Sequence, residues 1–108
     1  MLSIYLSMVE TEEEKDLVTE LYNTYKQILF NVSMSILHNT ADAEDAVQET
    51  FVRIISNLSK IDCANEKRSK AYIFVVTRNI CYDILRKKHK VVFLDDDREL
   101  VDTNAVSY

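Results

Sequence analysis

Two polar residues and a basic cluster share one stretch of this sequence, Ser69 to Lys90 (SKAYIFVVTRNICYDILRKKHK). Asn79 and Asp83 lie one helical turn apart, and four basic residues follow: Arg86, Lys87, Lys88 and Lys90. An asparagine can hydrogen-bond base edges or phosphate, and arginine and lysine neutralise phosphate. The stretch therefore predicts nucleic-acid binding. A cationic helix end that complements the helix dipole is the alternative, but it hardly requires four Lys/Arg within five residues.

At about 100° per residue, the side chains of a helix over 69–90 divide into two stripes. One is apolar and predicts a buried face, comprising Ile73, Val76, Ile80 and Ile84, widened by Phe74, Cys81 and Leu85. The other collects Tyr72, Val75, Asn79, Asp83, Arg86 and Lys90, with Arg78 and Tyr82 beside it. Asp83 can pair with Arg86 or Lys87. Tyr72 fits either the core or a platform on which an unstacked base could rest.

The segment before this helix, Leu58 to Lys70 (LSKIDCANEKRSK), has no helical periodicity and predicts a loop that ends near Ser69, a suitable N-cap residue. Loops held by rigid helices often carry binding residues, but a plain solvated connector fits this composition equally well. Its candidate nucleic-acid contacts are Lys60, Asn65, Lys67, Arg68 and Lys70.

An acidic–amide surface is expected on the preceding helix. Ala43, Val47, Phe51, Ile54 and Leu58 form the apolar stripe of that helix, and the opposite face holds Asp45, Gln48, Glu49, Val52 and Ser56. Such a face is usually a solvated one. A valine in the middle of it equally suggests a docking patch for another protein.

These candidate surfaces require an all-α fold, a compact bundle of three main helices at roughly 11–38, 41–59 and 69–90. The first helix opens with a T-x-x-E capping box at Thr11 and Glu14. Its apolar stripe is expected to comprise Leu17, Leu21, Tyr25, Ile28, Val32 and Ile36, and it should end near His38. Glycine and proline are absent, which disfavours turn-rich β folds.

The length of 108 residues corresponds to one domain. We expect an N-terminal extension at 1–10, whose first seven residues fray, a helical domain at 11–92 and an acidic linker at 93–108 that leads toward a further part of a longer protein. The formal charge of −5 hides an asymmetry, because 67–90 holds eight Lys/Arg and one acid. Segment 1–9 is too short to span a bilayer, so no membrane insertion is expected.

Neither catalysis nor a cofactor is indicated by the composition. Cys63 and Cys81 lie far apart and lack nearby histidine pairs, so we expect free thiols, an intracellular protein and no metal site. His38 has no partner with which it could form a catalytic pair, and no nucleophile–base pair or glycine-rich phosphate loop is visible.

Two runs, in this order and spacing, resemble a known family. DAEDAVQETF (42–51) and AYIFVVTRNICYDILRKKHK (71–90) are similar to the core-binding and promoter-reading segments of bacterial sigma factors, specifically the N-terminal domain of the extracytoplasmic-function (ECF) group. The similarity covers roughly 17–90. It implies a cytoplasmic transcription-initiation domain that binds core RNA polymerase and recognises and melts the promoter minus-ten element. An anti-sigma factor is a further partner that the resemblance suggests.

The resemblance also implies roles for the residues already singled out. The polymerase clamp coiled coil would dock on Asp45, Gln48, Glu49 and Val52. The segment Lys60 to Lys70 would capture a flipped base of the non-template strand, and Asp83 would orient its basic neighbours. The next helix would contact the minus-ten element through Tyr72, Arg78, Asn79, Arg86, Lys87 and Lys90.

Three features depart from the family pattern. The family often has tryptophan where Tyr72 stands, and the 60–70 segment offers no aromatic residue to brace a captured base. The second, helix-turn-helix sigma domain is also missing, so this chain should not recognise the minus-thirty-five element. A helical protein–protein adaptor that does not read DNA is the rival hypothesis.

Overall fold

The structure, a computed structural model, describes residues 2–61 and 64–96, with side chains described up to 89. It contains four α-helices and one short 3-10 turn within this part of the chain. Their bounds, in chain order, are α1 Leu2–Leu6, α2 Glu12–Leu37, α3 Thr40–Ser56, η1 Leu58–Lys60 and α4 Glu66–Asp96. The all-α bundle of three main helices is thereby confirmed. No described helix is long and apolar enough to cross a membrane.

Side-chain caps fix where the main helices begin. The Thr11 hydroxyl accepts from the Glu14 N–H (3.1 Å) and the Glu14 carboxylate accepts from the Thr11 N–H (3.4 Å), so the predicted capping box is confirmed. Asn39 caps α3 by accepting from the Asp42 N–H at 2.9 Å. Between these helices His38 adopts a left-handed conformation (φ 53°) and its N–H donates to the Met34 carbonyl, which ends α2.

The start of α4 differs from the prediction. Asn65, rather than Ser69, is its cap, because the Asn65 side-chain oxygen accepts from the Arg68 N–H at 3.1 Å. Ser69 is buried inside the helix. The expected loop over 58–70 is therefore wrong at both ends, since η1 occupies its first three residues and Lys67, Arg68 and Lys70 lie on α4. Helix α4 also continues past 90 to Asp96, where a linker was expected from 93.

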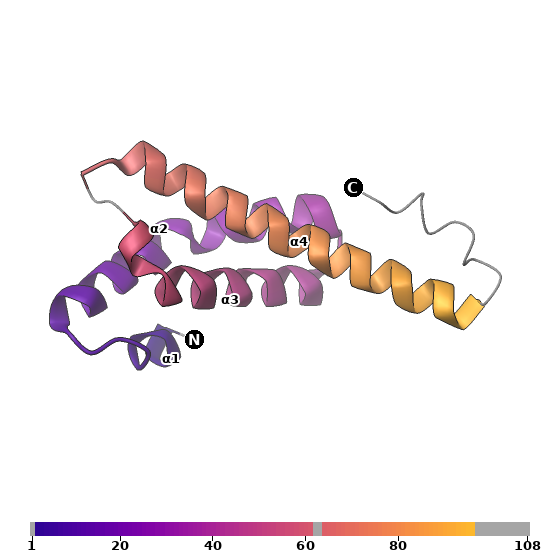
Figure 1. Ribbon diagram of the computed structural model, residues 1–108, viewed down its shortest axis with the longest axis horizontal. Helices are drawn as coiled ribbons and strands as arrows, with labels where there is room; N and C mark the ends of the chain where they lie inside the picture. Colours follow the sequence, from indigo (N-terminus) through magenta and orange to yellow (C-terminus); the bar gives the residue numbers. More distant parts are fainter. Residues whose placement is uncertain (1, 62–63, 97–108) are drawn as a thin grey trace.

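The core lies where α2, α3 and α4 contact one another (Figure 1). Its larger part is built around Leu29, Phe51, Ile54 and Ile73, all fully buried. A second cluster of Leu37, Ala46, Val76, Ile80 and Cys81 lies farther along α4. The apolar stripes predicted for α3 and α4 are confirmed, but Ile28 of α2 is 42% exposed and Leu29 is buried in its place.

The N-terminal residues belong to this core. Tyr5 of α1 is 2% exposed, and its ring lies 5.9 Å from that of Tyr22 and 5.5 Å from that of Phe51. The expectation that this segment frays is wrong for its described residues, 2–7, because the ring of Tyr5 fills the space between α2 and α3.

Helix α4 sets the length of the molecule. Its 31 residues correspond to about 46 Å at 1.5 Å per residue, against a longest dimension of 54 Å. It crosses α3 and continues beyond the ends of α2 and α3 (Figure 1). Residues 86–89, where it leaves the bundle, are all exposed, so the basic cluster is carried on a projecting rod.

Candidate polymerase and nucleic-acid interfaces

The predicted acidic–amide residues all lie on the solvent side of α3. Asp45, Gln48, Glu49 and Val52 are exposed, and we call this surface the α3 outer face. Val52 is 39% exposed, which confirms that an apolar side chain lies among polar ones. Glu49 forms an ion pair with Arg53 at 3.3 Å along the same helix. The outer face is thus a polar surface with an apolar centre on one rigid element, which is the composition of a protein-docking patch.

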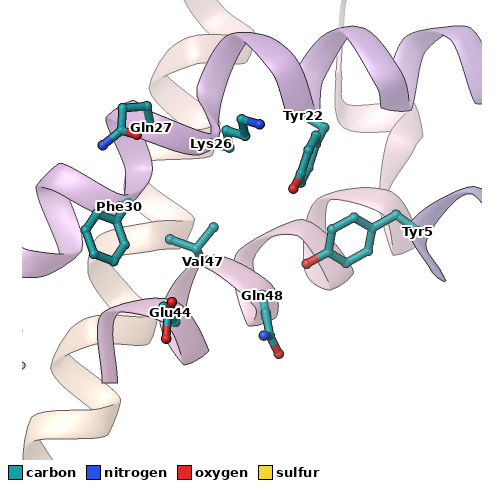
Figure 2. Close-up of a pocket in the computed structure, with 8 residues that line it drawn as sticks. All are labelled: Tyr5, Tyr22, Lys26, Gln27, Phe30, Glu44, Val47 and Gln48. Atoms are coloured by element: carbon teal, nitrogen blue, oxygen red, sulfur yellow. The ribbon is translucent and has the colours of Figure 1, made fainter. Parts of the chain in front are cut away.

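An aromatic groove adjoins the α3 outer face at Gln48 (Figure 2). It measures about 370 Å³ and lies between α2 and α3, with Tyr5 of α1 at one end. The Lys26 ammonium is 5.0 Å from the centre of the Tyr22 ring, a cation–π contact. Burial raises the pKa of the Tyr5 hydroxyl, which therefore stays protonated near neutral pH. The residues that line the aromatic groove are Tyr5, Tyr22, Lys26, Gln27, Phe30, Glu44, Val47 and Gln48.

This groove was not predicted from the sequence. Tyr5 was assigned to a frayed segment, and Tyr22 was given no role. Segment 2–9 (LSIYLSMV) contains only two polar residues, Ser3 and Ser7, and it is too short for a reliable helical period.

The predicted nucleic-acid residues divide between two sides of α4. Lys67 and Lys70 line a hollow of about 500 Å³ together with Tyr25 and Ile28 of α2. Lys70 also lies 5.9 Å from the centre of the Phe74 ring. Because a helix turns by about 100° per residue, Arg68, Asn79 and Arg86 fall on a different side, away from α2. Lys60 is exposed on η1.

The side of α4 away from α2 carries an open hollow of about 420 Å³, lined by Asn79, Tyr82, Asp83 and Arg86. We call these four residues the α4 hollow. Tyr82 is 38% exposed, whereas Tyr72 is partly buried and packs against both core clusters. The more accessible aromatic ring beside Asn79 is therefore that of Tyr82, which the sequence placed next to the polar stripe without assigning it a role.

Ion pairs organise the basic end of α4. Asp83 pairs with Arg86 rather than with Lys87. The Lys88 ammonium donates to Asp42 of α3 at 2.6 Å. Lys87 is exposed and is in no ion pair within the described part of the chain. The side chain of Lys90 lies outside the described residues.

The α3 outer face and the basic end of α4 meet in a groove of about 240 Å³. Asp45, Glu49 and Arg53 of α3 line one side of it, and Asp83 and Lys87 of α4 line the other, next to Ile80 and Ile84. The polar residues of the two helices thus adjoin in one groove. The full lining is Asp45, Glu49, Arg53, Ile80, Asp83, Ile84 and Lys87.

The remaining chemically active side chains have structural positions. Burial raises the pKa of the Cys81 thiol, which makes it a core residue rather than a nucleophile. Cys63 lies outside the described residues. His38 is exposed at the end of α2. No group of three His, Cys, Asp or Glu side chains that could hold a metal ion occurs in the described part of the chain.

Comparisons with known proteins point to one family. The family model for Sigma-70 region 2 matches residues 21–91. Over 80 residues, 74% of this chain and 47% of the relative, the sequence is 31% identical to the ECF RNA polymerase sigma factor SigM of Bacillus subtilis (strain 168). It is 26% identical over 82 residues to the ECF RNA polymerase sigma factor SigW of the same organism, covering 76% and 43% of the two chains.

The chain thus spans about half the length of the curated relatives that it matches. No solved structure gives a significant match to it.

Proposed function

The chain belongs to the Sigma-70 region 2 family, as a transcription-initiation domain of the ECF type, and from this premise we propose that it binds core RNA polymerase and recognises and melts the promoter minus-ten element. One observation carries the proposal. An acidic–amide face on α3 and a polar, basic side of α4 are both exposed, and they adjoin along one groove. A single domain can therefore engage a protein and a nucleic acid side by side.

Polymerase binding is assigned to the α3 outer face. Its carboxylates and amide suit a partner helix with basic and polar residues, and Val52 supplies an apolar centre. The aromatic groove beside Gln48 enlarges the surface available to such a helix (Figure 2). We assign this face to the clamp coiled coil of the polymerase.

DNA binding is assigned to the side of α4 that carries Arg68, Asn79 and Arg86. Extruding a base from the duplex costs a few kcal/mol, and stacking on an aromatic ring returns about 1–3 kcal/mol per base. Tyr82 offers such a ring within the α4 hollow, and Asn79 beside it offers the donor and acceptor that base edges require. Arg86 and Lys87 would then hold the phosphates of the unpaired non-template strand and carry no sequence information.

Lys67 and Lys70 face a separate hollow on the α2 side, with Ile28 exposed at its edge. We place these lysines on a different part of the strand from the segment bound at Asn79, since they lie at the opposite end of α4 from Arg86 and Lys87. The proposed DNA contacts thus form two groups, one at the start of α4 and one in the part of α4 that follows Arg78.

The docking assignment is tested by Gln48→Ala with Glu49→Ala. We expect a loss of core-polymerase capture in a pull-down, because the amide and one of the carboxylates of the α3 outer face are removed. Glu20→Ala with Asn23→Ala is the matched control, since it deletes an exposed acid and an exposed amide from α2. Equal capture of the two double variants would refute the assignment to α3.

A further inference from the structure

Asp42 is the one acid of the D-A-E-D run (42–45) that belongs neither to the α3 outer face nor to the aromatic groove. It lies seven residues before Glu49 and so on the same edge of α3, the edge that faces α4. Its backbone N–H is held by the Asn39 cap at 2.9 Å. Asp42 also lies in the first turn of α3, where the helix dipole attracts a negatively charged side chain. Asp42 is therefore a charged acceptor whose position is fixed by its own helix.

The partner of Asp42 is on another element. Lys88 of α4 donates to it at 2.6 Å, across 46 residues of sequence. The three other ion pairs that the structure describes each join residues of a single helix. Asp42 is only 22% exposed, so the contact is partly shielded from solvent on the α3 side.

The contact is located where α4 leaves the bundle. Ile80 and Cys81 are buried, Ile84 and Leu85 are half-buried, and residues 86–89 are exposed. Apolar packing thus weakens along α4 just before the basic cluster, and α4 then projects beyond α2 and α3 (Figure 1). At this point a polar contact between helices can influence the direction of the projecting rod.

We propose that Asp42 is a positioning residue for DNA binding: by holding Lys88, it orients the basic end of α4 so that Arg86 and Lys87 face the phosphates. The proposal rests on the proposed function and adds to it a division of labour within the basic cluster. Lys88 is engaged with the protein, whereas Lys87 is left for the DNA.

The sign of the effect of Asp42→Asn separates this proposal from simple electrostatics. Removal of a negative charge near a DNA-binding surface should strengthen binding to a polyanion. If Asp42 positions α4, Asp42→Asn should instead weaken DNA binding. We expect a loss of about two- to five-fold, the range that an exposed or partly shielded ion pair can supply.

The experiment uses the 108-residue chain with core RNA polymerase and a fluorescein-labelled mixed-sequence single strand of about 12 nucleotides, within the usual site sizes for single strands. Anisotropy gives the Kd at several salt concentrations. Asp42→Asn and Lys88→Gln should each weaken binding by a similar factor, and the double variant should be no weaker than either. Lys88 is not assigned to a phosphate, and these variants change only how often the free chain holds α4 in the bound orientation. None of the three should therefore change the salt slope, whereas Lys87→Gln should reduce it by about 0.7. Asp42→Glu, which keeps the carboxylate, should restore binding at least in part.

Asp16→Asn on α2 is the control for charge alone and should not weaken binding. Unchanged or tighter binding by Asp42→Asn would overturn the proposal, as would a fall in salt slope for Lys88→Gln equal to that for Lys87→Gln. Lys88→Gln decides the question if Asp42→Asn fails to fold, since it leaves the side chains of the first turn of α3 unchanged. A wild-type chain that binds no DNA would instead overturn the proposed function, and this inference with it.

Discussion

Lys87 is the residue whose removal should change the salt dependence of DNA binding most cleanly. It is exposed and is in no ion pair within the described residues, so its charge is available to a phosphate. One neutralised phosphate contributes about 0.7 to the slope of log K against log salt concentration for single strands. Lys87→Gln should therefore flatten the slope by about 0.7. Between 50 and 200 mM salt, this makes the affinity fall about 2.6-fold less than that of the wild type.

Arg86 should contribute less than Lys87, because the Asp83 carboxylate already pairs with it. The double variant Arg86→Gln with Lys87→Gln is expected to flatten the slope by more than 0.7 and less than about 1.4, twice the single-phosphate value. Asp83→Asn should act in the opposite direction and steepen the slope, because it releases the Arg86 charge.

The assay is a salt titration of strand binding by fluorescence anisotropy, with core polymerase present at saturation. Lys15→Gln is the control, since that lysine lies in the first turns of α2 beside Glu12. A wild-type slope for Lys87→Gln would show that the basic end of α4 does not contact the strand. A flattening as large for Lys15→Gln would show that net charge, rather than position, governs binding.

Three further predictions concern the fold. Tyr5→Ala should lower the free energy of unfolding by about 3–5 kcal/mol in urea titrations, as for other buried aromatic residues, and a loss below about 1 kcal/mol would mean that α1 does not pack on the core. Asn65→Ala should cost about 0.5–2 kcal/mol through the lost α4 cap, whereas Asn65→Ser should be nearly neutral; equal losses would contradict the cap. The folded-state pKa of Cys81 is raised, so its contribution to stability is complete below the ordinary pKa of 9.0 and is lost as the pH rises through the folded-state value. Stability should thus fall more steeply above about pH 9 in the wild type than in Cys81→Ala, and parallel curves would place the thiol in solvent.

The three main helices could be predicted because each has a strong local signal. Thr11 and Glu14 satisfy one another within four residues, and the apolar stripes of α3 and α4 repeat over several turns. The start of α4 was harder, because Asn65 and Ser69 are both suitable cap residues. Because Asn65 is the cap, α4 begins one turn earlier than predicted. The residues of that added turn are mostly charged, so they show no apolar periodicity from which a helix could be predicted.

The site was predictable where a face follows from one helix alone, as for Gln48 and Val52 on α3. It was not predictable where two helices meet. The pairing of Lys88 with Asp42 depends on how α4 crosses α3, and periodicity within one helix does not contain that angle. The exposure of Ile28 has the same origin, since the neighbouring helices cover the adjacent Leu29 instead. The separation of Lys70 from Asn79 was missed for a different reason, because Lys70 was placed in a loop rather than on α4.

The most direct test of the account measures the binding of labelled non-template minus-ten strands, of varied sequence, to core RNA polymerase with and without this chain. We predict that the chain confers tight binding of a subset of sequences, and that Gln48→Ala with Glu49→Ala abolishes this gain while Asn79→Ala reduces the preference among sequences. Equal binding with and without the chain, or a gain that survives the loss of Gln48 and Glu49, would contradict the claim that α3 docks the polymerase while α4 holds the promoter strand.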